Sequence, residues 1–421
     1  MLPFVLTSVL TLSLSLAAKS NPVTRSAQQS RVAAAWYAGW HATEGFPLSD
    51  VSWAKYTTMI YSFAITTPSV DFLSLEGSNP SLLPQFVTEA HANNVAAHIA
   101  IGGWDGGLWF SSNVASAENR TAFVNTVVNF TKQYDLDGVN FDWEYPDDQG
   151  IGCNTISAND TANFLAFLQE LRTDPTGANL TLSAAVGVTP FRDASGTPSS
   201  NVSGFADVLD YIAIMNYDVW GSWSPAVGPN APLDDSCAPP GYQQGSAVSA
   251  VDAWTAAGIP AHQIVLGVAS YGHSFSVSPA DAFVAGGSGP GVELASYPPF
   301  NATNQPLGDA WDDTGSVDAC GVYEGPGGDW DFWGLVGGGF LTAQGNPADG
   351  IYYRYDNCSQ TPYVYNKTSE VMVSFDNAQS FGVKGEYIKS AGLLGFAMWE
   401  AGGDYKDILL DSIRYSAGYD M

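Results

Sequence analysis

Two carboxylates stand two residues apart in the segment Asp137–Pro146, which reads DGVNFDWEYP. Side chains alternate between the two faces of a strand, so Asp142 and Glu144 share one face. Two carboxyl groups close together on a buried face disfavour each other's ionisation, and one of them keeps its proton at moderate pH. Such an acid can protonate a leaving oxygen, as the cleavage of a glycosidic bond requires. The segment therefore predicts an acid catalyst, with Glu144 as the proton donor.

The rest of this segment indicates where the two acids point. Asn140 lies on their face, whereas Phe141 and Trp143 lie on the other. In a barrel of parallel strands, we expect the large apolar face to pack against surrounding helices and the polar face to point inward. Glu144 comes last and should emerge at the carboxyl end of the barrel, where active sites of this fold lie. An ordinary polar strand end that binds a cation is the structural alternative.

The elements that must position this segment are eight short apolar runs. Nearly continuous apolar strands indicate burial on both faces, which is typical of parallel sheets. The runs are 32–38, 57–65, 95–103, 138–144, 180–187, 209–218, 264–272 and 395–400.

Helical patterns lie between these runs, as in Glu118–Tyr134 and Thr161–Arg172. Eight alternating units predict an α/β fold, a (β/α)8 TIM barrel. More than 120 residues separate the last two runs, too many for one crossover helix. We therefore predict an α+β insertion between strands seven and eight, with short strands such as Ile351–Tyr355 and Val371–Phe375. The predicted organisation is a signal peptide at 1–18, barrel at 19–272, insertion at 273–385 and barrel again at 386–421.

The strand-four segment resembles the signature D-G-x-D-x-D-W-E of family 18 glycoside hydrolases, the mark of chitinases. Further segments match the same family in order, so the resemblance covers almost everything after the signal peptide. The further matches are YSFA at Tyr61–Ala64, IGGW at Ile101–Trp104, MNYD at Met215–Asp218, GVASYG at Gly267–Gly272 and MWE at Met398–Glu400.

The resemblance implies a substrate-assisted, retaining mechanism, in which the N-acetyl group of the sugar is the nucleophile. By this resemblance Glu144 protonates the leaving oxygen and later activates water. Asp142 would accept a hydrogen bond from the acetamido N–H, and Tyr217 would donate one to the acetamido oxygen. Trp399 would form the apolar floor under that sugar. On the same argument, the expected substrate-binding residues are Tyr37, Phe63, Gly103, Trp104, Asn140, Tyr145, Met215, Asp218 and Trp223.

Two positions depart from the family pattern. Asn140 replaces the middle Asp of the signature, so the acidic network loses one charge and Asp142 gains an amide neighbour. We expect activity to survive with a changed pH profile. His273 follows Tyr271 and Gly272 where an Arg is common, and a plain loop histidine is the simplest interpretation.

The first 18 residues are apolar and end in small residues, as in a cleaved signal peptide, so we expect a secreted protein. Cys153, Cys237, Cys320 and Cys358 then predict two disulfides, with three connectivities open. Glycans are expected on several sequons, without a choice among them; the sequons begin at Asn119, Asn129, Asn159, Asn179, Asn201, Asn301, Asn357 and Asn366.

The composition of the chain limits the classes of molecule that the protein is expected to bind. A net charge of −28 argues against binding to nucleic acids and anionic membranes. The 13 Trp among 421 residues favour a carbohydrate ligand, because Trp side chains can pack on the apolar faces of sugar rings. No HExxH motif or Cys/His ligand cluster occurs, so we expect no metal and no cofactor. The expected protein is a monomer acting on chitin or chitooligosaccharides. The alternatives are an endo-β-N-acetylglucosaminidase acting on N-glycans and a chitin-binding lectin without activity.

Overall fold

Eight parallel strands close into a barrel in the computed structural model, which describes residues 31–284 and 292–420. The order around the ring is β1-β15-β7-β6-β5-β4-β3-β2, which confirms the predicted TIM barrel. The predicted signal peptide at 1–18 lies outside the described residues. The barrel strands are β1 (Val32–Ala38), β2 (Thr58–Ala64), β3 (Ala96–Gly102), β4 (Gly138–Asp142), β5 (Thr181–Val186), β6 (Tyr211–Ile214), β7 (Ile264–Ala269) and β15 (Gly395–Trp399).

Each barrel strand has two buried faces with different surroundings. On β1, Ala34 and Trp36 belong to an apolar cluster inside the barrel, together with Ile60 and Ala100. The other face of the strands packs against helices in a much larger cluster. The covering helices are α1 (Leu83–Ala92), α2 (Phe110–Val114), α3 (Ala117–Tyr134), α4 (Asp160–Thr173), α5 (Ser203–Ala206), α6 (Ala247–Ala256), α8 (Ala378–Ala391) and α9 (Ile408–Ala417).

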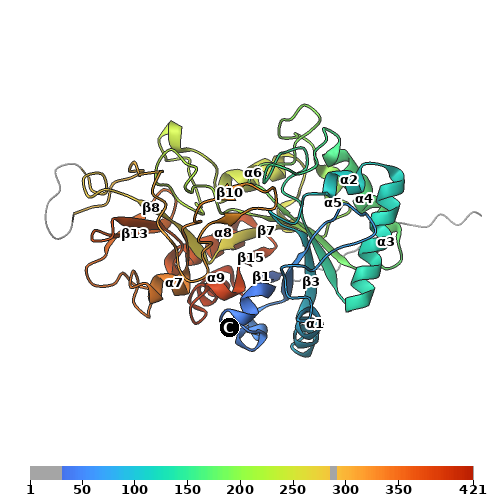
Figure 1. The fold of residues 1–421 in the computed structure, drawn as a ribbon, viewed down its shortest axis with the longest axis horizontal. Coiled ribbons are helices and arrows are strands. Elements are labelled where there is room, and N and C mark those ends of the chain that lie inside the picture. Colours follow the sequence, from blue (N-terminus) through green and yellow to red (C-terminus); the bar gives the residue numbers. More distant parts are fainter. Residues whose placement is uncertain (1–30, 285–291, 421) are drawn as a thin grey trace, which may run out of the picture. The chain divides into compact units, whose positions relative to one another are not determined.

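The insertion follows β7 directly. Its antiparallel sheet has the order β11-β8-β14-β13-β12, and a separate hairpin pairs β9 with β10. Figure 1 shows β8, β13 and α7 gathered on the side of the barrel away from α3 and α4. The elements of the insertion are β8 (Tyr271–Ser276), β9 (Ser316–Val317), β10 (Tyr323–Glu324), β11 (Asp329–Asp331), α7 (Phe332–Gly337), β12 (Tyr352–Asp356), β13 (Thr361–Asn366) and β14 (Val371–Ser374).

The insertion begins and ends slightly earlier than the predicted segment 273–385. Its first strand starts at Tyr271, and α8 already starts at Ala378. The start of α8 has a local cause, because the Asn377 side chain accepts a hydrogen bond from the Ser380 amide and forms a capping box. The chain therefore returns from the insertion to the barrel at Asn377, the N-cap of α8.

Two disulfides close long loops. They join Cys153 to Cys320 and Cys237 to Cys358, one of the three connectivities that the sequence left open. Both link a loop of the barrel to the insertion, so the two parts are held together covalently. None of the described helices is long and apolar enough to cross a membrane.

Candidate active site

Strand β4 positions the two acids as the alternation predicts. Phe141 packs outward against Phe164 and Phe167 of α4, with ring centroids 5.9 and 5.5 Å away. Asn140 and Asp142 are buried on the inner face. Glu144 follows the strand at the carboxyl end of the barrel, hereafter the barrel mouth. The Glu144 side chain is surrounded by protein but keeps part of its surface open.

Burial changes the ionisation of both acids. It raises the pKa of Asp142 to about 7. Burial also raises the pKa of Glu144 well above its usual range, and the charge of Asp142 raises it further. Among the described residues, Asp142 Oδ1 has no hydrogen-bond partner, although it is buried. The pair therefore holds a proton at neutral pH and has an acceptor atom free for a ligand.

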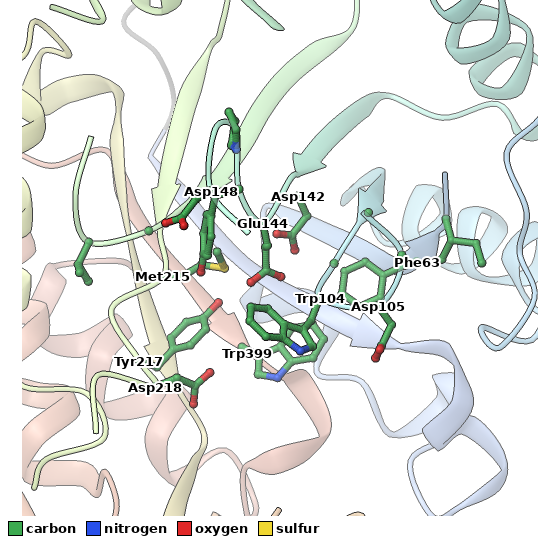
Figure 2. A pocket seen from close by; sticks show the side chains of 18 of the residues that line it. Phe63, Trp104, Asp105, Asp142, Glu144, Asp148, Met215, Tyr217, Asp218 and Trp399 are labelled. Atoms are coloured by element: carbon green, nitrogen blue, oxygen red, sulfur yellow. The ribbon is translucent and has the colours of Figure 1, made fainter. Parts of the chain in front are cut away.

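A cavity of about 800 Å³ opens at the barrel mouth. Figure 2 shows Asp142, Glu144 and Tyr217 directed into this cavity, with Trp399 below the two acids and beside Tyr217. The cavity has an apolar floor and a few polar groups, which is the usual make-up of a small-molecule site. The predicted residues that line it are Phe63, Gly103, Trp104, Asp142, Glu144, Tyr145, Met215, Tyr217, Asp218 and Trp399.

The Trp399 ring is held from two sides. Phe63 stacks near it with ring centroids 5.6 Å apart, and Trp36 meets it edge-on at 6.1 Å. Trp36 Nε1 donates a hydrogen bond of 3.2 Å to Asn140 Oδ1 inside the barrel. Asn140 therefore lies one layer below the cavity and supports its floor through Trp36, rather than lining the cavity as we expected.

Tyr217 remains a hydrogen-bond donor. Burial raises its pKa well above the usual range, and the charges of Asp142, Asp218 and Glu144 raise it further. Gly267 on the neighbouring strand leaves room for the Tyr217 ring, because a Cβ at that position would lie 3.1 Å from Tyr217 Cε1. A neutral hydroxyl between carboxyl groups suits donation to a carbonyl oxygen of a ligand.

Tyr37, which we expected in the cleft, lies on the outer face of β1. Its ring packs against Tyr61 and Phe86, and its hydroxyl donates a 2.9 Å hydrogen bond to the Phe46 carbonyl. The inward position of this strand belongs to Trp36. Both faces of β1 are apolar, so the sequence did not reveal which of the two aromatic residues points inward.

Trp223 also lies outside the residues that line the cavity. It is 63% exposed and meets the His273 ring edge-on, with centroids 5.4 Å apart. Several further residues line the cavity although we did not expect them there. They include Trp40, Glu76, Asp105, Arg192 and Gln244. Two of them, Trp40 and Asp105, come shortly after the end of a barrel strand, whereas the others carry no such signal in the sequence.

His273 is a buried member of β8 rather than a plain loop residue. Its Nε2 lies 2.7 Å from Asp218 Oδ1 and its Nδ1 lies 2.7 Å from Asp329 Oδ1. Asp218 lines the cavity next to Tyr217, so His273 contacts the wall of the site from outside.

Within 31–284 and 292–420, no group of three or more His, Cys, Asp and Glu side chains is arranged to hold a metal ion. The chemistry that this arrangement can perform is proton transfer from Glu144, supported by hydrogen bonds from Tyr217 and to Asp142.

Known proteins resemble this chain over nearly its whole length. Residues 32–404 match the family model of glycosyl hydrolases family 18. A Moniliophthora roreri protein described as a chitinase-like effector is 51% identical over 100% of this chain and 99% of its own length. Chitinase A1 of Niallia circulans is 29% identical over 76% of this chain and 42% of its own length.

A solved structure has the same fold. The crystal structure of a chitinase from Rhizomucor miehei is 33% identical and has a TM-score of 0.81, covering 91% of this chain and 99% of its own. The family match, the closed barrel and the acidic pair at the end of β4 all point to the same family. This chain belongs to glycosyl hydrolases family 18.

Proposed function

We propose that this protein is a secreted chitinase that hydrolyses β-1,4 linkages between N-acetylglucosamine units with retention of configuration. The observation that carries the proposal is the buried pair of Asp142 and Glu144, which keeps a proton at neutral pH at the edge of a cavity with a Trp399 floor. An aromatic floor suits the apolar face of a sugar ring.

In the first step, Glu144 gives its proton to the glycosidic oxygen while the bond from that oxygen to C1 breaks. The acetamido carbonyl oxygen of the same sugar forms a new bond to C1, so no enzyme nucleophile is needed. Tyr217 donates a hydrogen bond to the acetamido oxygen and orients it for attack on C1. Asp142 accepts one from the acetamido N–H through an oxygen that has no other partner among the described residues.

In the second step, water attacks C1 while Glu144, now a carboxylate, takes one of its protons. The bond to the acetamido oxygen breaks, and the product keeps the β configuration. Trp399 holds the sugar ring against the acids throughout, because its own position is fixed by Trp36 and Phe63.

Secretion is part of the proposal. The apolar start of the chain favours it, and so does the pairing of all four cysteines in disulfides, which form in oxidising compartments. We further propose that the protein acts as a monomer. Determining the N-terminal residue of the mature protein in culture medium and its mass in solution tests both points.

Binding of chitooligosaccharides without cleavage is a second candidate function. The relative from Moniliophthora roreri that is 51% identical is described as chitinase-like, and Asn140 replaces an acid of the signature. The same cavity and aromatic floor would serve a lectin, so only a measurement of cleavage separates the two functions.

The experiment compares wild type, Glu144→Gln and the control Glu89→Gln, which changes an exposed residue of α1. Chitohexaose is the substrate, and products are separated by size and anomer. We expect β-anomeric products from wild type and the control. We expect a loss of about 10²–10⁴-fold in rate for Glu144→Gln, with binding retained, because Gln cannot donate the proton. Wild-type binding without any cleavage would favour the lectin.

A further inference from the structure

His273 has a carboxylate against each of its ring nitrogens. Nε2 lies 2.7 Å from Asp218 Oδ1, and Nδ1 lies 2.7 Å from Asp329 Oδ1. The Asp218 contact has hydrogen-bond geometry, whereas the Asp329 contact is a close ion pair in which Oδ1 accepts no hydrogen bond from the described residues. An unprotonated ring nitrogen would repel a carboxylate at either distance, so both nitrogens must carry a proton. The ring is therefore an imidazolium. Its side chain is only 7% exposed, so water screens this charge little.

The two carboxylates come from different parts of the fold. Asp218 follows β6 in the loop at the barrel mouth, whereas Asp329 lies on β11, directly opposite His273 in the insertion sheet. The His273 charge thus lies between two negative groups in a protein whose net charge is −28. Without a cation at this point, the two carboxylates would repel each other.

Asp218 is held at several atoms. Besides His273, the Tyr271 hydroxyl donates to its Oδ1 over 2.5 Å. Its backbone amide donates over 2.8 Å to Asn230 Oδ1, and Asn230 in turn donates to the Tyr271 carbonyl. The Asp218 backbone has a φ of +55°, in the left-handed region, so its conformation depends on these contacts.

Tyr217 immediately precedes Asp218, and both line the cavity. A displacement of Asp218 therefore moves the Tyr217 hydroxyl. We propose that His273 is a positioning residue that fastens the loop carrying Tyr217 and Asp218 to the insertion sheet, so that the Tyr217 hydroxyl is fixed for the acetamido oxygen. This inference rests on the proposed function for the identity of the group that Tyr217 meets.

The electrostatics at His273 are consistent with a permanent charge. Burial by itself lowers the pKa of His273, but the charges of Asp329 and Asp218 outweigh burial and raise it to about 10. Tyr271 is the other titratable group on the same strand, and burial and the Asp218 charge raise its pKa well above the usual range. His273 thus differs from an ordinary histidine, which loses its proton near pH 6.5.

The kinetic test uses His273→Gln, His273→Arg and the control His262→Gln, which changes an exposed histidine before β7. With chitohexaose, we expect His273→Gln to lower kcat about 10- to 100-fold with little change in KM, because the Tyr217 hydroxyl acts mainly in the transition state. We expect His273→Arg to restore most of kcat, since a guanidinium can face both carboxylates. The control should match wild type.

A merely structural histidine gives a different result. In that case His273→Gln lowers thermal stability but leaves kcat of the folded protein unchanged, and this outcome overturns the proposal. Failure of His273→Arg to rescue a fall in kcat also overturns it. If His273→Gln does not fold, His273→Arg and a measurement on wild-type protein still test the positioning role of His273.

That measurement is nuclear magnetic resonance of imidazole-labelled wild-type protein. We expect the His273 ring to stay doubly protonated at pH 8, and a neutral His273 ring at that pH overturns the proposal. If wild type binds chitohexaose without cleaving it, the proposed function fails, but the positioning role is still tested. In that case the readout is the nuclear magnetic resonance signal of the Tyr217 ring. His273→Gln should shift this signal and His273→Arg should restore it, and an unchanged Tyr217 signal in the Gln variant overturns the role.

Discussion

Asn140 uses both ends of its amide inside the barrel. Its Nδ2 donates to Ser183 Oγ over 2.9 Å, and its Oδ1 accepts from Trp36 Nε1. We expected Asp142 to gain this amide as a neighbouring donor, but the amide nitrogen donates to Ser183 instead. Replacement of an acid by Asn at this position therefore removes a charge beneath Asp142 without supplying a donor to it.

Asn140→Asp should move the acid limb of the kcat/KM profile to higher pH. Burial already raises the pKa of Asp142 to about 7. A second carboxylate beneath it raises that pKa further, so a smaller fraction of Asp142 is ionised at a given pH. An ionised carboxylate accepts the hydrogen bond from the acetamido N–H more strongly than a protonated one. Rates with chitohexaose between pH 4 and 9 check this, and the matched control is Asn94→Asp, at an exposed position. Superimposable profiles would contradict the expectation.

At the scale of elements, the hairpin of β9 and β10 reaches a distant part of the barrel. The insertion leaves from β7 and returns to β15, whereas β3 and β4 lie opposite these strands in the ring. Yet Cys320, beside the hairpin, is bonded to Cys153 in the loop after β4, and the Ala319 amide hydrogen-bonds Asp105 after β3. This part of the insertion therefore extends to the far side of the barrel mouth.

The Cys153–Cys320 disulfide also lies close to the acid. Asn154, the next residue after Cys153, donates a 3.2 Å hydrogen bond from its side chain to the Glu144 carbonyl. Replacing both cysteines by Ser should lower the free energy of unfolding by about 3–5 kcal/mol, because the cross-link closes a loop of 167 residues. It should also lower kcat, because the loop that holds Glu144 loses its anchor. Denaturant unfolding and kinetics measure the two effects.

The second disulfide is the matched control. Cys237 and Cys358 close a loop of 121 residues, and neither residue lines the cavity. Their double Ser variant should lose a similar free energy of unfolding while kcat of the folded protein stays near wild type. Equal losses of kcat in the two variants would show that the first disulfide acts through global stability alone.

At the scale of the whole molecule, a buried ion pair joins the insertion to the barrel. Lys384 Nζ of α8 lies 2.7 Å from both carboxylate oxygens of Asp376, which follows β14. Both side chains are fully buried. Burial raises the pKa of Asp376 and lowers that of Lys384, and each partner's charge opposes these shifts. The pair is therefore tolerated only because each charge has its partner.

Lys384→Met should lower the free energy of unfolding by about 3–5 kcal/mol, because it leaves the Asp376 charge buried and unpaired. The double variant Lys384→Met with Asp376→Leu should recover most of this loss, since apolar residues of similar size often replace such pairs at little cost. Urea unfolding of the wild type, single and double variants provides the comparison. If the double variant is as unstable as Lys384→Met, the loss of stability comes from altered packing and not from an unpaired Asp376 charge.

The elements of this protein follow from local patterns in its sequence. The apolar run Val32–Ala38 coincides with β1, because a strand buried on both faces has to be apolar throughout. The alternation in Asp137–Pro146 put Asp142 on the inner face, because side-chain direction in a strand depends only on parity. Recognising which further residues surround Glu144 depended on resemblance to a family, since composition alone identifies no cavity.

Only the tertiary structure decided the pairings between distant residues. Both faces of β1 are apolar, so the choice of Trp36 over Tyr37 as the inward aromatic depends on packing inside the closed barrel. The partner of Cys153 and the two carboxylates around His273 depend on where the insertion meets the barrel mouth. Local periodicity determines the type and faces of an element, whereas contacts between segments that are distant in the sequence are determined by how the elements pack together.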